Sequence, residues 1–185
     1  TMQGNTVGQY ELNKISSISS STLTLEFALS NTYTTTAQII AFKTYDNVTI
    51  ENSGVLTCDA WDGSKGGVLF INASNLTVDS TSFIDVSEKG FLGSTGAISS
   101  PASKGADTSN SAYGGGGGAY GGDGSDGYTT IAGGAGYGLF YSPVCMGSAG
   151  GRNSNRNKNG GKGGGIIFIK LTGTATIDGT IQSNG

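Results

Sequence analysis

The feature that most constrains the fold of this chain is an internal repeat with a constant spacing. Residues 47–51 (NVTIE) recur 28 residues later as residues 75–79 (NLTVD), and the offset persists where residues 55–57 align with residues 83–85. Repeated units of 20–30 residues that contain strands are typical of stacked rungs or of a symmetric sandwich, because each unit covers the apolar face of the next.

A third copy of this pattern lies at residues 175–182 and stops close to Gly185, so we expect the chain to be a segment of a longer protein. A second repeated element is a glycine pair followed by an apolar run, GGVLFI at residues 66–71 and GGIIFI at residues 164–169. Continuous apolar runs indicate strands buried on both faces. We expect the two runs to lie side by side or in equivalent places.

The N-terminal part of the chain is predicted to form short strands. Residues 23–27 (LTLEF) alternate apolar and polar side chains, as half-buried strands do, and the serines of residues 16–21 predict the turn before them. A further strand is expected over residues 38–42 (QIIAF). No segment combines helix caps with a period of 3.6, so essentially no α-helix is expected.

Glycine dominates the stretch between the two apolar runs. The chain has 34 glycines but only 2 prolines, which excludes collagen. Five glycines are spaced three residues apart and are expected to have a structural role, namely Gly115, Gly118, Gly121, Gly124 and Gly127. A period of three is that of the polyproline II helix, and a glycine face lets neighbouring backbones approach and pair their hydrogen-bonding groups.

These patterns together predict an all-β fold, either a β-sandwich or a short β-solenoid, with an inserted bundle of glycine-rich polyproline II helices. Residues 1–45 are expected to form an N-terminal β-strand segment that contacts a neighbouring subunit. Residues 46–89 and 164–185 are expected to form the repeated β body, and residues 90–163 the glycine-rich insert.

Two motifs carry a resemblance to known proteins, WDGSKGG at residues 61–67 and NGGKGGGII at residues 159–167. Residues 45–185 resemble the glycine-rich domain proteins, which include bacterial and phage surface proteins, phage tail-tip adhesins and the glycine-rich domain of anaplastic lymphoma kinase-type receptors. The resemblance implies a polyproline II bundle inserted in a β body, and extracellular display, adhesion or assembly without catalysis. The cysteine pattern of those receptors is not evident, so their ligand-binding role does not carry over.

Composition argues against several classes of function. The chain has no histidine, which excludes histidine-based nucleophile systems and histidine-ligated zinc sites. A net charge of -3 without a basic block argues against a nucleic-acid partner. No apolar run reaches the roughly 18 residues of a membrane span. We therefore expect a protein that is not an enzyme, uses no cofactor and does not cross a membrane.

A calcium site is the one metal hypothesis. Residues 121–127 match the calcium-binding pattern G-G-x-G-x-D, in which Asp123 and Asp126 would supply oxygen ligands. Such sites need several stacked copies, and this chain has one. The alternative is a solvent-exposed tip of the glycine-rich insert.

Two kinds of covalent modification are compatible with the sequence. Asn47, Asn72 and Asn75 each begin an N-glycosylation sequon, which matters only in a secreting eukaryote. Cys58 and Cys145 are the only cysteines. They either form one disulfide or remain two buried free thiols, and the sequence leaves both alternatives open.

Tyrosines accompany the glycines of the insert. Tyrosine with glycine and serine is typical of adaptable binding surfaces, and the candidate binding residues are Tyr113, Tyr120, Tyr128 and Tyr137. The alternative is that these rings cover the flanks of the glycine-rich bundle.

The favoured function is that of an extracellular structural protein, a self-assembling filament or surface-layer subunit at a cell or virion surface. Low charge and a strand-rich N-terminus suit strand pairing between chains. The alternative is an adhesin or receptor-binding domain that recognises glycan or protein through the glycine-rich loops.

Overall fold

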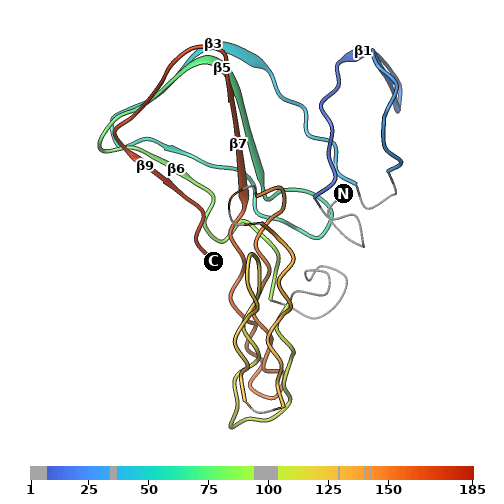
Figure 1. The fold of residues 1–185 in the computed structure, drawn as a ribbon, viewed down its shortest axis with the longest axis vertical. Coiled ribbons are helices and arrows are strands. Elements are labelled where there is room, and N and C mark those ends of the chain that lie inside the picture. The colour runs from blue at the N-terminus through green and yellow to red at the C-terminus, as the bar shows by residue number, and fades with distance from the viewer. Residues whose placement is uncertain (1–7, 34–36, 94–103, 129, 140, 142) are drawn as a thin grey trace. The chain divides into compact units, whose positions relative to one another are not determined.

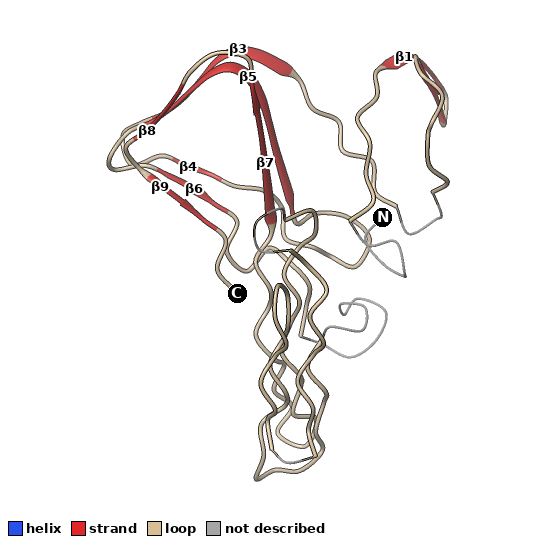
Figure 2. Cartoon of the chain, in the orientation of Figure 1, coloured by secondary structure: helices blue, strands red, loops and turns tan. Residues whose placement is uncertain are grey.

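The computed structural model describes residues 8–33, 37–93, 104–128, 130–139, 141 and 143–185. These residues contain nine strands and no helix, which confirms the all-β prediction (Figure 2). The chain divides into two compact units, Thr1–Gln38 and Ile39–Gly185.

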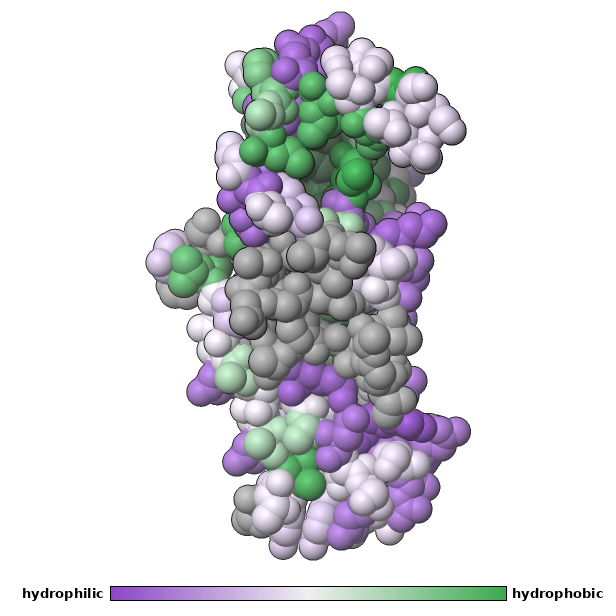
Figure 3. Space-filling model, turned by 90° about the vertical axis from the view of Figure 1, so that its right-hand side faces the viewer, coloured by the Kyte–Doolittle hydropathy of each residue, from purple (hydrophilic) through white to green (hydrophobic). Residues whose placement is uncertain are grey.

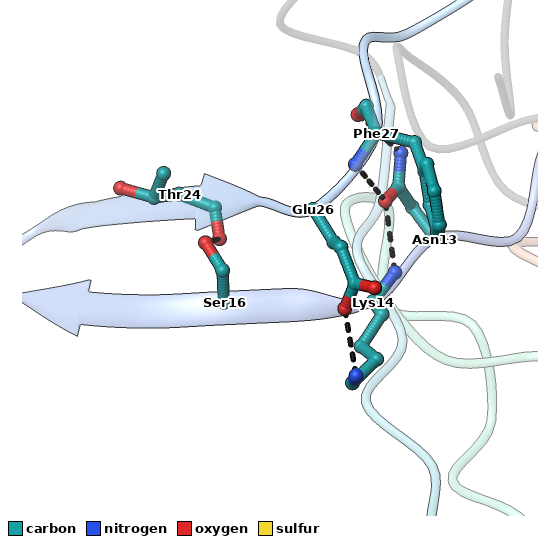
Figure 4. Close-up of polar contacts among 6 residues, drawn as sticks. All are labelled: Asn13, Lys14, Ser16, Thr24, Glu26 and Phe27. Carbon is teal, nitrogen blue, oxygen red and sulfur yellow. Dashed lines mark hydrogen bonds and ion pairs between the residues drawn. The ribbon is translucent and has the colours of Figure 1, made fainter.

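The first unit contains a β-hairpin, in which β1 (Ile15–Ser19) pairs with β2 (Thr22–Leu25) in antiparallel fashion. Below the strands, the Asn13 side chain accepts the backbone N–H of Phe27 at 3.2 Å and donates to the Phe27 carbonyl at 2.8 Å. An ion pair of 2.7 Å joins Lys14 to Glu26 beside it (Figure 4). The strand expected over residues 23–27 is present as β2 and ends at Leu25, but the turn expected over residues 16–21 is confined to Ser20 and Ser21, because the preceding serines belong to β1.

The second unit contains seven strands that stack in parallel as three coils of a short solenoid (Figure 1). Coil 1 consists of β3 (Thr44–Ile50) and β4 (Val55–Leu56), and coil 2 of β5 (Val68–Val78) and β6 (Phe83–Asp85). Coil 3 consists of β7 (Ile166–Leu171), β8 (Ala175–Ile177) and β9 (Thr180–Gln182). The order β3-β5-β7 and β4-β6-β9 places coil 2 between the other two.

The sequence repeat sets the register of the coils. Asn47 pairs with Asn75 and Val55 with Phe83, at the same offset in both sheets. The two apolar runs lie side by side as expected, since Val68 pairs with Ile166. Because the side chains at equivalent positions of the repeat are alike, each column of the solenoid stacks similar residues.

Two details of the strand prediction were wrong. The apolar run and the second repeat copy are not separate strands, because β5 runs through both as one strand of 11 residues. Residues 38–42 form no strand, and β3 begins only at Thr44. The Phe42 ring still follows the repeat, since it stacks on Phe70 with ring centroids 4.3 Å apart.

The solenoid core lies inside the coils and is most complete in coil 2. Its buried cluster consists of Ile50, Ile71, Leu76, Val78 and Ile84. Coil 2, which lies between the other two coils, supplies four of these five side chains. The fifth, Ile50, comes from coil 1.

A second buried group lies where the glycine-rich segments meet the coils. Trp61 and Phe91 pack edge to face with centroids 5.8 Å apart, and both are buried together with Met146. Gly67 has a φ of 75° and lies so close to the Met146 sulfur that a Cβ there would overlap it. The WDGSKGG motif therefore forms a corner of the solenoid.

The described glycine-rich residues between 104 and 165 run as extended segments alongside one another below the coils (Figure 1). They pair through backbone hydrogen bonds, such as those from Gly116 N–H to Ala106 O at 3.0 Å and from Gly151 N–H to Gly116 O at 2.8 Å. At four of the five predicted structural glycines a Cβ would collide with the backbone of a neighbouring segment, namely Gly115, Gly118, Gly124 and Gly127. Gly121 instead lies in an exposed bend.

Candidate functional site

The two aspartates of the calcium motif bind backbone amides. Asp123 Oδ1 accepts the N–H of Gly136 at 2.6 Å, and Asp126 Oδ1 accepts the N–H of Gly133 at 2.9 Å. Across the described ranges, no group of three or more metal-ligating side chains lies together. Both aspartates are exposed, and their carboxylates tie adjacent segments of the insert together.

The four candidate tyrosines separate into two pairs with different surroundings. Tyr113 and Tyr128 stack face to face with centroids 3.9 Å apart, and Tyr128 is 47% exposed. Tyr120 and Tyr137 pack edge to face, and burial raises the pKa of both phenols. The Tyr137 hydroxyl donates to the Met146 carbonyl. Thus one pair is available to a ligand and the other covers the bundle.

The sequon asparagines lie in the stacked columns of the coils. The amide nitrogen of Asn72 donates to Thr44 Oγ1 at 2.7 Å, and that of Asn75 donates to Asn47 Oδ1 at 2.9 Å. A glycan on Asn72 or Asn75 would replace one of the two amide hydrogens of a nitrogen that donates between coils. Asn47 is exposed, and its nitrogen donates no hydrogen bond within the described part of the chain.

Cys58 and Cys145 are both free thiols, so the disulfide alternative is not realised in this structure. Cys58 is half-buried and Cys145 is buried, and burial raises the pKa of each thiol. Since the thiolate is the nucleophilic form of cysteine, neither residue is activated for covalent chemistry.

A hollow of about 510 Å³ lies between the glycine-rich segments and coil 3. Six of its fourteen lining residues are glycines, its polar side chains are those of Tyr120, Cys145, Ser148 and Ser183, and none of its side chains is charged. The Ser148 hydroxyl is engaged by the backbone of Ala119. This lining offers packing surface but no pair of acid and base groups.

The two ends of the solenoid are the surfaces that the sequence did not reveal. At the coil 3 end, Ile177 is 37% exposed and Ile181 is 43% exposed, although their partners in coil 2, Val78 and Ile84, are completely buried. Within the residues that the structure describes, no strand pairs with the outer edges of β3, β4, β8 or β9. The apolar core is therefore open at coil 3.

The coil 1 end carries a shallow hollow of about 270 Å³. Its walls come from the end of β3, the following turn and β4, and consist of Thr49, Ile50, Glu51, Gly54, Val55 and Leu56. Val55 is 58% exposed there. Figure 3 shows hydrophobic residues gathered in the upper part of its view and mostly hydrophilic residues in the lower part.

Comparisons with protein-family models, curated proteins and solved structures find no match to this chain. The described residues contain no helix long and apolar enough to cross a membrane.

Proposed function

We propose that this chain is a non-enzymatic structural protein that acts outside the cell, at a cell or virion surface, as a self-assembling subunit of a filament or surface layer. The observation that carries this proposal is that parallel coils stack in register while, among the described residues, no strand pairs with the outer edge of either end coil. The resemblance to glycine-rich surface proteins supports the extracellular setting.

Open coil ends favour association for two physical reasons. Unpaired strand edges present free N–H and C=O groups that can pair with another chain. Exposed apolar side chains such as Ile181 gain free energy when they leave water, by roughly 25 cal/mol for each Å² of apolar surface. When two different surfaces of one protein fit each other without closing a ring, the product is a filament.

The glycine-rich segments are proposed to be polyproline II helices that brace the coils. Backbone hydrogen bonds between segments and glycines at their contacts support this conformation. The bundle then acts as a rigid spacer that the assembled coils would display along their side.

Self-assembly is tested by sedimentation velocity and electron microscopy of the purified 185-residue chain over a concentration series. We expect the weight-average mass to rise with concentration and rods or sheets to appear in micrographs. A single monomeric species at every concentration, up to several mg/ml, would contradict the proposal.

An adhesin function is the second candidate, and the exposed stack of Tyr113 on Tyr128 favours it. Stacked tyrosine rings offer a flat apolar surface with hydroxyl groups at its edge, which suits sugar rings. Binding on a glycan array that is lost in Tyr128→Ala but kept in Tyr137→Phe would support this role. An array without hits would count against it.

A further inference from the structure

We propose, on the basis of the self-assembly above, that successive copies stack head to tail, with coil 3 of one copy on coil 1 of the next, in the register that continues the internal repeat. The occupant of each open end is thus a second copy of this chain.

Each copy holds two coil-to-coil interfaces of the same chemistry. Coil 1 covers coil 2 through the parallel pairing of β3 with β5, and coil 2 covers coil 3 through β5 with β7 and β8. Coil 1 of a second copy on coil 3 would repeat the inner contacts of the first interface, because coil 3 has Ile177 and Ile181 where coil 2 has Val78 and Ile84. The proposed interface therefore continues one that exists within the fold.

The inner columns show what is missing at the end. Leu56, Ile84 and Ile181 occupy one column, in which Ile84 is fully buried between its neighbours and Ile181 is 43% exposed. Ile177 is the open end of the column that contains Ile50 and Val78. A further coil would bury both isoleucines as Val78 and Ile84 are buried.

The shapes of the two ends match this arrangement. The hollow at the coil 1 end is lined by Ile50 and Leu56, which are the coil 1 members of these same two columns. In the continued register, Ile177 and Ile181 of one copy enter the hollow of the next. The protruding and receiving groups are thus on opposite ends, as head-to-tail stacking requires.

The outer columns set the same register. Phe42 stacks on Phe70, and Phe70 packs on Phe168 with centroids 6.0 Å apart. The amides of Asn47 and Asn75 bond to each other, and Asn75 Oδ1 accepts the N–H of Thr174. Continued stacking places Phe168 of one copy opposite Phe42 of the next, and Thr174 opposite Asn47.

The polarity is tested with two variants, each blocked at one end. Ile177→Lys/Ile181→Lys places charges on the coil 3 end, and Tyr45→Lys/Val55→Lys does so at the coil 1 end, where both residues are exposed. We expect each variant alone to be monomeric in sedimentation velocity. An equimolar mixture should give a heterodimer of twice the monomer mass and nothing larger, because only one open pair of ends remains.

Each other outcome overturns the inference. Dimers of either variant alone would show that like ends meet, and a monomeric mixture beside an assembling parent would place the interface elsewhere. A parent chain that is itself monomeric would overturn the proposed function and this inference with it. If a lysine variant does not melt cooperatively like the parent, serine replaces lysine at the same positions. The serine variants are again expected to be monomeric alone and to form a heterodimer when mixed.

The register is tested by cross-linking in a background that lacks Cys58 and Cys145. Thr49, Thr77 and Thr176 share one exposed column, so Thr176→Cys in one copy should join Thr49→Cys in the next through a short bis-maleimide. Thr44→Cys is the control, since it lies five residues along the strand, about 16 Å away. Equal or better cross-linking to Thr44→Cys would overturn the register.

Discussion

Ile84 and Ile181 pair in one column of the solenoid, yet Ile84 is completely buried whereas Ile181 is 43% exposed. The two side chains have the same chemistry and differ only in whether a coil lies on both sides of them. This difference locates the unfinished part of the core at the coil 3 end.

The first prediction compares these two isoleucines. Ile84→Ala should lower the free energy of unfolding by about 2–5 kcal/mol, because it leaves a cavity in a closed core. Ile181→Ala should lower the free energy of unfolding of the dilute monomer by less than half as much. It should nevertheless weaken self-association more than Ile84→Ala does. Urea denaturation and sedimentation measure the two effects, and equal losses of stability would contradict the assignment of the open end.

A second prediction concerns two neighbouring glycines. A Cβ at Gly160 would overlap the Gly150 carbonyl, whereas a Cβ at Gly161 meets nothing within 4 Å. Gly160→Ala should therefore lower the melting temperature by several degrees, while Gly161→Ala should leave it nearly unchanged. If both variants melt alike in calorimetry, the backbones of the bundle are not packed as described.

A third prediction follows from Asp79 in the turn after β5. The Ser82 hydroxyl, the backbone N–H of Asn52 and the Thr81 hydroxyl and N–H bond its carboxylate, and they lower its pKa from 3.8 to about 2. Because the folded-state pKa is the lower one, the stabilisation is present above about pH 4 and is lost as the pH falls through 2.

Asp79→Asn tests this pH dependence. The variant should melt below the parent at pH 7, and the difference should narrow between pH 4 and pH 2 as the parent loses its advantage. A melting difference that stays constant across this range would show that the charge of Asp79 plays no part.

A fourth prediction concerns the salt dependence of assembly. Ile50, Val78 and Ile177 share one column, and each is followed by an acidic residue, namely Glu51, Asp79 and Asp178. In the proposed register, Asp178 of one copy therefore lies near Glu51 of the next. These like charges repel, and salt screens them over about 10 Å at 0.1 M. Association should strengthen from 10 mM to 300 mM NaCl, and Asp178→Asn should reduce this dependence; assembly that weakens with salt would argue against the register.

The sequence repeat predicted the pairing of the strands well because a parallel coil stacks equivalent positions. The offset between Asn47 and Asn75 is the register itself, and the matching apolar runs correctly predicted that Val68 and Ile166 lie side by side. The repeat alone did not separate a sandwich from a solenoid, because both bury a period-two apolar face. It also did not show that the apolar run and the second repeat copy form one continuous strand, β5.

The candidate site was less predictable because it lies where a column of the solenoid ends and no further coil covers the last side chain. Ile84 and Ile181 look alike in the sequence, and only the stacking order exposes the second. Similarly, Tyr128 and Tyr137 have the same glycine-rich surroundings along the chain, but Tyr128 is exposed whereas Tyr137 is partly buried and donates to the Met146 carbonyl. The carboxylates of Asp123 and Asp126 matched a calcium pattern, and the fold directs them to backbone amides.

Sedimentation velocity of the parent chain beside the variant Ile177→Lys/Ile181→Lys shows whether the open coil ends join copies of this chain. We expect the mass of the parent to grow with concentration while the variant stays monomeric with an unchanged fold by circular dichroism. A variant that assembles as the parent does would contradict the account.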